Sequence, residues 1–336
     1  MPAQADSIRD QQWHLGFLNV AKAHQFSQGD GVRVGLIDTG VDTRLPDLGG
    51  AVVDGTEIGG TGDGRVDSDG HGTAMAGLIA GRGRGPSDGV LGIAPKASIL
   101  SVQTLHSDFG GDPNDLGLGI SWAVQHGAKV ICIAGGTSEE PTVKEAVEAA
   151  IKADVVVVAA VGNASPTRTA RIAFPAKLPG VLAVGGVDKT GKRADVSIIG
   201  PEVAIVAPAV DIVSTDTFGR YEKATGTSEA TAIVTGAVAL VRAKYPKLTA
   251  PEVIRRLTAT ATDKGAPGRD PEYGFGVLDL VKALTADVLP ETPAASAVPA
   301  PKQGGGPPSA AILAALGVLV LVAVLAVLAA RRSRRP

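Results

Sequence analysis

The chain is organised around residues 225–241, which read TGTSEATAIVTGAVALV. The small-residue turn Gly226-Thr227-Ser228 runs directly into apolar residues at helical spacing, which predicts a buried helix. Ser228 therefore stands at the start of a helix, where free N–H groups and the positive end of the helix dipole favour negative charge. A serine in this position serves either as a nucleophile or as a helix cap, and the stretch by itself leaves both roles open.

Outward from this stretch, continuous apolar runs alternate with helical patterns along the chain. Such runs are buried on both faces, as in a parallel sheet. The alternation predicts a doubly wound α/β domain, with a mostly parallel sheet and helices on both faces. The predicted strands are residues 32–37, 98–103, 129–134, 154–160 and 181–187, and the predicted helices are residues 74–81, 113–126, 141–152, 228–241, 250–261 and 277–284. The Gly- and Asp-rich residues 54–70 are predicted to form a loop.

The composition fits one large globular domain. The chain has 336 residues, of which 44% are hydrophobic and 3% aromatic, and its 44 glycines indicate close packing of helices on a sheet. The net charge is −2, and without the four arginines at the C-terminus it is −6, which argues against a nucleic-acid partner. Cys132 lies in an apolar run and is predicted to be a buried core thiol.

The C-terminal region predicts a membrane anchor. Residues 1–287 form the globular part, and residues 288–309 are rich in proline and glycine, which indicates a linker. Residues 310–330 carry no charge and span about 30 Å as a helix, the thickness of the hydrocarbon layer. The basic tail 331–336 predicts a single-pass protein of the cell membrane with a cytoplasmic C-terminus and an extracytoplasmic domain. No signal peptide is predicted before the domain.

A serine hydroxyl becomes a nucleophile when a base takes its proton, and the base needs an orienting carboxylate. All five histidines precede residue 127, which excludes the serine–acid–histidine order of the α/β-hydrolases. His71 lies between glycines at the mouth of a small-residue helix, whereas His126 is predicted at a helix end. The remaining histidines are predicted at the surface: His14, His24 and His106.

Asp38 ends the first predicted strand, where an α/β sheet carries its functional groups. The sequence Asp38-Thr39-Gly40 is also typical of aspartic-protease loops. Those enzymes need two such aspartates, and no second Asp-Thr-Gly occurs in this chain. The aspartic-protease hypothesis is therefore the weaker one for this stretch.

Three separated stretches, in the order Asp, His, Ser, resemble the subtilisin-like serine proteases, or subtilases. They are LIDTGVD around Asp38, DGHGTAMAGLIAG around His71 and GTSEATAIVTGAVAL around Ser228. The resemblance covers residues 11–284. It implies that Asp38 orients the base, that His71 acts as general base and then as acid, and that Ser228 attacks the substrate. It also implies that Asn163, in AAVGNAS, donates a side-chain hydrogen bond in the oxyanion hole.

The resemblance further implies a polypeptide substrate, which pairs in extended form with residues 134–136 and with the segment 105–110. The implied substrate-binding residues are Ala134, Gly135, Gly136, Ala159, Ala160 and Gly162. Subtilases usually carry Ser-Leu-Gly where this chain has Ala-Gly-Gly at 134–136, so the primary specificity pocket is expected to differ. Glu229 stands at a position that is usually apolar or small. Its carboxylate is expected to raise the pKa of His71 or to disfavour acidic substrates.

Among the subtilases, the chain is most similar to the mycosins, the membrane-anchored subtilases of actinobacterial type VII secretion systems. The resemblance rests on QQWHL at 11–15, the Pro- and Gly-rich linker, and the single membrane helix with its basic tail. It implies a serine endopeptidase associated with the secretion machinery. Two alternatives remain open: a low-activity or inactive scaffold of a secretion complex, and a protease that matures leader peptides.

No metal and no cofactor are predicted. Asp63, Asp67 and Asp69 precede His71, but they lack the glycine and glutamate spacing of an EF-hand, so a solvated loop is the preferred interpretation. The glycines of residues 81–89 follow a helix rather than a strand and therefore predict no nucleotide site.

Overall fold

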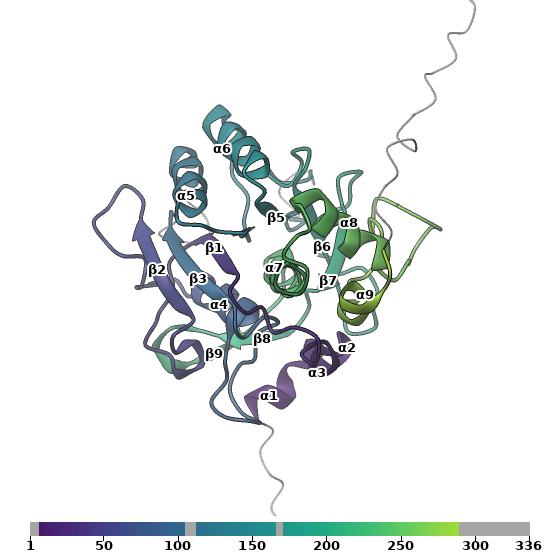
Figure 1. The fold of residues 1–336 in the computed structure, drawn as a ribbon, viewed down its shortest axis with the longest axis horizontal. Helices are drawn as coiled ribbons and strands as arrows, with labels where there is room; N and C mark the ends of the chain where they lie inside the picture. Colours follow the sequence, from purple (N-terminus) through teal and green to yellow (C-terminus); the bar gives the residue numbers. More distant parts are fainter. Residues whose placement is uncertain (1–6, 105–111, 166–170, 289–336) are drawn as a thin grey trace, which may run out of the picture. The chain divides into compact units, whose positions relative to one another are not determined.

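The computed structural model describes residues 7–104, 112–165 and 171–288 (Figure 1). The compact unit that contains them ends at Val288. The predicted membrane helix 310–330, the basic tail and nearly all of the predicted linker lie outside the described residues. Among the residues that are described, no helix is both long and apolar enough to cross a membrane.

The centre of the molecule is a sheet of seven strands in which every neighbouring pair is parallel. The strand order is β2-β3-β1-β4-β5-β6-β7, so the direction of winding reverses between β1 and β4. Open α/β sheets bind ligands at the carboxyl ends of their strands beside such a switch point. The strands are β1 Arg33–Asp38, β2 Val52–Glu57, β3 Ser98–Gln103, β4 Val130–Ile133, β5 Val156–Ala160, β6 Leu182–Val187 and β7 Ile205–Pro208.

Helices cover both faces of this sheet because successive side chains of a strand point to opposite faces. Val156 and Val158 of β5 join the core that contains α4 and α7, whereas Val157 and Ala159 join the core that contains α5 and α6. Figure 1 shows α5 and α6 together, apart from α7. The helices are α4 His71–Ala80, α5 Pro113–Gln125, α6 Pro141–Lys152, α7 Thr227–Lys244, α8 Ala250–Thr260 and α9 Leu280–Thr285.

The α/β class and the parallel sheet predicted from the apolar runs are confirmed, with small shifts at the strand ends. Two predictions are wrong in detail. Residues 54–57 belong to β2 and pair with β3, although their Gly-rich sequence predicted a loop. Gly55 is needed there, because a Cβ atom would lie 2.4 Å from the carbonyl oxygen of Asp63. The last helix begins at Leu280 rather than at Val277, because Val277 pairs with Thr262.

A separate antiparallel ribbon consists of β8 Ile212–Thr215 and β9 Tyr221–Ala224. The sequence predicted neither strand, since each has four residues and β9 carries charged side chains. The ribbon holds α4 through two side chains of β8. Ser214 Oγ donates to the Ala74 carbonyl at 2.6 Å, and Thr215 Oγ1 donates to the Thr73 carbonyl at 2.8 Å. The ribbon therefore fixes the helix that begins at His71.

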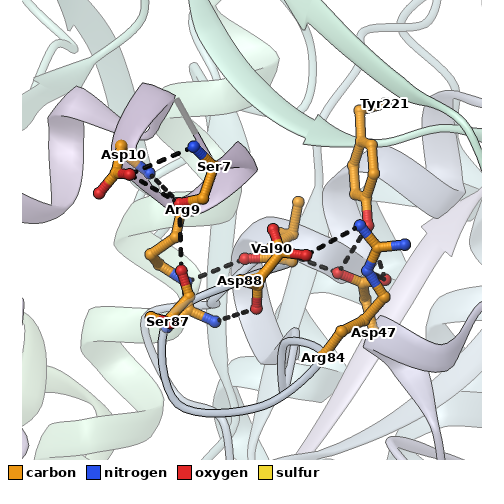
Figure 2. Close-up of polar contacts among 10 residues, drawn as sticks. Ser7, Arg9, Asp10, Asp47, Arg84, Ser87, Asp88, Val90 and Tyr221 are labelled. Atoms are coloured by element: carbon orange, nitrogen blue, oxygen red, sulfur yellow. Dashed lines mark hydrogen bonds and ion pairs between the residues drawn. The ribbon is translucent and has the colours of Figure 1, made fainter. Parts of the chain in front are cut away.

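The N-terminal segment is tied to a loop beside this ribbon (Figure 2). Arg9 donates to the carbonyl groups of Gly89 at 2.9 Å and Asp88 at 2.8 Å. The buried carboxylate of Asp47 accepts from the Val90 N–H at 2.5 Å and from the Tyr221 hydroxyl at 3.1 Å. The short helices of this segment are α1 Ile8–Gln11, α2 Trp13–Phe17 and α3 Val20–Ala23.

His14 and His24 are not at the surface, which corrects the prediction from sequence. His14 is fully buried, and burial lowers its pKa to about 3, so its ring stays neutral. His24 is half-buried, with Nε2 2.9 Å from the Ile93 carbonyl oxygen. Both rings are enclosed because α2 and α3 pack on the core through apolar neighbours such as Leu18 and Val20. His106 lies outside the described residues.

Candidate active site

Asp38 and His71 meet at the switch point of the sheet. Asp38 is the last residue of β1, and its side chain is 2% exposed. Its Oδ1 atom accepts the Thr39 N–H at 2.8 Å and lies 2.7 Å from Nδ1 of His71. A carboxylate in this position holds the imidazole with Nδ1 protonated, which leaves Nε2 free to accept a proton.

His71 is the first residue of α4, and its neighbours are glycine for steric reasons. Gly70 has a φ of +110°, in the left-handed region that side chains rarely adopt. A Cβ atom at Gly72 would lie 2.1 Å from the Gly40 carbonyl oxygen. The Gly-His-Gly pattern in the sequence therefore reflects how closely α4 approaches the end of β1.

Asp67 positions the start of α4, a role that its sequence context does not reveal. Its carboxylate is 2% exposed and accepts hydrogen bonds from five donors. The donors are the hydroxyl groups of Thr39 and Thr73 and the N–H groups of Asp69, Gly70 and Thr73. The N-cap residue Gly70 has no side chain, so Asp67 binds the free N–H groups at the start of α4 in its place. Within the described ranges, no group of three or more His, Cys, Asp or Glu side chains is placed to hold a metal.

We expect Asp67→Asn to lower the free energy of unfolding by about 3 kcal/mol, as measured by urea denaturation. The amide keeps the shape of the side chain, but its NH₂ group would face donors that need an acceptor. Asp63→Asn is the matched control, because Asp63 is an exposed carboxylate in the same loop. Its expected effect is below about 0.5 kcal/mol. Equal losses in the two variants would contradict the role assigned to Asp67.

The charges around His71 stabilise its protonated form. Burial lowers the pKa of His71, but the charge of Asp38 and the hydrogen bond to it outweigh burial and raise this pKa to about 9. Glu229 and Asp69 add smaller contributions in the same direction, as expected for Glu229 from the sequence. Cys132 is fully buried, and burial raises the pKa of its thiol to about 12, which agrees with its prediction as a core residue.

Ser228 is the second residue of α7, and its hydroxyl does not cap the helix. The N-cap is Gly226, which lacks a side chain, and Ser228 Oγ donates to the Ala134 carbonyl oxygen at 2.5 Å. The helix-cap interpretation of this serine is therefore wrong. For Ser228 to act as the predicted nucleophile, its hydroxyl would have to leave this hydrogen bond.

Asn163 follows β5 and has a fixed amide orientation. Its Oδ1 atom accepts from the Thr227 N–H at 2.9 Å and from the Thr227 hydroxyl at 3.1 Å. The Nδ2 group therefore points away from Thr227 and lies 2.9 Å from the position that a Cβ atom at Gly226 would occupy. The amide is placed as a donor beside the start of α7, where an oxyanion would also gain from the helix dipole.

Glu229 places a buried carboxyl group beside Ser228. Its side chain is 5% exposed, and its Oε2 atom has no hydrogen-bond partner in the described part of the chain. Oε2 lies 2.9 Å from the same Cβ position at Gly226, close to the amide of Asn163. The pKa of Glu229 is raised to about 7, because burial and, to a smaller extent, the charge of Glu222 outweigh the lowering by a backbone hydrogen bond and by His71.

The predicted substrate-binding residues lie at the carboxyl ends of two neighbouring strands. Ile133 of β4 pairs with Ala159 of β5, so residues 134–136 and 160–162 leave the sheet side by side. The side chains of Ala134, Ala159 and Ala160 are buried, whereas space around Gly135 is open and a Cβ atom there would touch nothing within 4 Å. Gly162 has a φ of +97°. Their contacts with substrate stay predictions, and segment 105–110 lies outside the described residues.

Comparisons with known proteins agree on one family. The profile of the subtilase family, peptidase S8, matches residues 29–276. Subtilisin DY of Bacillus licheniformis is 40% identical over 258 residues, which cover 76% of this chain and 92% of that protein. Mycosin-3 of Mycobacterium tuberculosis is 34% identical over 396 aligned positions, which cover 95% of this chain and 84% of that protein.

The solved structures lead to the same group of proteins. The serine protease MycP1, described as an essential component of the type VII (ESX-1) secretion system, superposes with a TM-score of 0.74 at 33% identity. The match covers 85% of this chain and 90% of that structure.

Proposed function

The chain belongs to the subtilase family of serine proteases and is related to the mycosins of type VII secretion, and from this premise we propose that it is a membrane-anchored endopeptidase with Asp38, His71 and Ser228 as its catalytic triad. Its substrate is a polypeptide. Its place of action is the outer side of the cell membrane, near a type VII secretion machine.

The observation that carries this proposal is the 2.7 Å contact between His71 Nδ1 and Asp38 Oδ1, beside a serine at a helix start. In the proposed reaction, the hydroxyl of Ser228 leaves the Ala134 carbonyl, and Nε2 of His71 takes its proton as the oxygen attacks the peptide carbonyl. His71 then protonates the leaving amine, and water hydrolyses the acyl-enzyme by the same steps. Asn163 Nδ2 and the Ser228 N–H stabilise the negative oxygen of each tetrahedral intermediate.

The membrane anchor rests on the sequence alone. Residues 310–330 are apolar over the length of a membrane span, and the arginines that follow favour a cytoplasmic tail. Mycosin-3 aligns with 95% of this chain, which supports a shared organisation along most of its length.

A second candidate function is a scaffold of a secretion complex with little turnover. It is favoured by the hydrogen bond from Ser228 to Ala134, which engages the hydroxyl proton with a backbone carbonyl, and by the buried carboxyl group of Glu229. A serine whose hydroxyl stays hydrogen-bonded to the Ala134 carbonyl is not activated as a nucleophile.

A fluorophosphonate probe, which reacts only with an activated serine, separates the two functions. We expect the full-length chain in bacterial membranes to be labelled, and we expect His71→Ala to abolish labelling. A folded but unlabelled chain would favour the scaffold.

The anchor is tested in the same preparation by alkaline carbonate extraction. The full chain should stay in the membrane pellet, and a chain that ends at Asp287 should not.

A further inference from the structure

Two glutamates beside His71 have no cationic partner in the described residues other than His71 itself. Glu229 is buried with Oε2 unpartnered, and Glu222 of β9 is half-buried and joins none of the ion pairs between described residues. The nearby Asp216 is already paired with Arg220, at 2.9 Å between Oδ2 and Nε. Lys223 follows Glu222 in the strand, so it points to the opposite face of the ribbon.

The surroundings of these two carboxyl groups disfavour their charged form. Burial raises the pKa of Glu222, and the charges of Asp216, Asp69 and Asp67 raise it further. Glu222 in turn raises the pKa of Glu229. Enclosed carboxyl groups that repel one another are relieved when a cation binds between them, because the cation restores the charged state that burial disfavours.

Their position relative to the scissile bond follows from the chemistry of the base. His71 delivers its proton to the leaving amine, so the leaving half of the peptide lies on the His71 side. The acyl half lies on the other side, along the ends of β4 and β5. Glu222 pairs with Ser214 of β8, whose side chain donates to the Ala74 carbonyl of α4, so the side chain of Glu222 faces the helix that begins at His71. Glu229 lies next to Ser228, and its charge acts on His71. The two glutamates therefore flank the leaving half of the peptide.

We propose that Glu222 and Glu229 form a subsite for a positively charged side chain, lysine or arginine, at the residue that follows the scissile bond. The half-buried Glu222 receives the charge at the mouth of the subsite. The unpartnered Oε2 of Glu229 lies deeper, beside Ser228. The subsite rests on the proposed protease function and adds to it a substrate class: peptides whose new N-terminal residue after cleavage is basic.

The test uses one peptide that the full-length chain cleaves, resynthesised with lysine, norleucine or glutamate after the scissile bond. Norleucine has the four side-chain carbons of lysine without the charged nitrogen. We expect kcat/KM for the lysine peptide to exceed that for norleucine by about tenfold or more, and the glutamate peptide to be the poorest. In Glu222→Gln and Glu229→Gln, the lysine-to-norleucine ratio should fall towards one, whereas Glu145→Gln, an exposed site on α6, should leave the ratio unchanged.

Equal kcat/KM for lysine and norleucine in the wild-type chain would overturn the subsite and leave the protease function standing. A ratio that survives both glutamine variants would also overturn it, since the preference would then come from other residues. Failure to find any cleaved peptide, together with absence of fluorophosphonate labelling, would overturn the protease function and the subsite with it.

Discussion

Replacing Ser228 by alanine is expected to lower kcat for peptide hydrolysis by about 10⁶, the size of the loss known for the serine of subtilisin itself. The variant has no atom that can form the acyl-enzyme. Residual hydrolysis would come from the oxyanion donors and from substrate binding alone. The melting temperature should change little, because the half-buried hydroxyl makes one hydrogen bond to the described residues, to Ala134.

The matched control is His71→Ala, alone and combined with Ser228→Ala. Because base and nucleophile act as one unit, the double variant should be no slower than either single variant. Turnover within tenfold of wild type in a pure Ser228→Ala preparation would refute the assignment of the nucleophile.

Asp38→Asn is expected to lower kcat by about 10⁴ while the fold is retained. The amide of asparagine would donate to Nδ1 of His71 across the present 2.7 Å contact. That bond selects the tautomer with the proton on Nε2, which cannot accept the proton of Ser228. Crystallography of the variant should show an unmoved imidazole. A loss of the same size in a variant whose ring has moved would indicate disruption rather than the wrong tautomer.

The same substitution has an expected signature in the pH profile. Neutral His71 is the proposed base, so wild-type kcat/KM should rise with pH until the pKa of His71, about 9, is passed. Asp38→Asn removes the strongest contribution that raises this pKa, and the rise of kcat/KM should move to lower pH.

The free energy of unfolding should change in the same pH window. The pKa of folded His71 lies above the ordinary value of 6.5, so its stabilising effect is complete below about 6.5 and is lost as pH rises through about 9. Asp38→Asn should flatten that loss in urea denaturation.

The sequence located those parts of the site that depend on local pattern. Ser228 and His71 stand where small-residue turns enter helices, and Asp38 ends an apolar run, so each was found from its own neighbours. The parallel sheet then brings Asp38 and His71 together, while the catalytic roles of these residues stay predictions.

Other features depend on contacts between distant segments and could not be found in this way. Asp67 has the same residue type as the exposed Asp63, and only the packing of α4 makes it a buried acceptor for five donors. Glu222 lies in a four-residue strand that exists because β8 pairs with it. The burial of His14 likewise follows from the docking of α2, which its local sequence does not reveal.

The order in which the site residues occur along the chain also bears on self-proteolysis during synthesis. Asp38 and His71 come early, whereas Ser228 arrives on α7, after all seven strands of the main sheet. Domains emerge from the ribosome N-terminal end first. With the proposed triad, a nascent chain carries the base His71 without the nucleophile Ser228 until the central sheet has been synthesised. Self-digestion then requires the docking of α7, which also completes the core. Proteolytic activity would therefore arise together with the folded state that resists proteolysis.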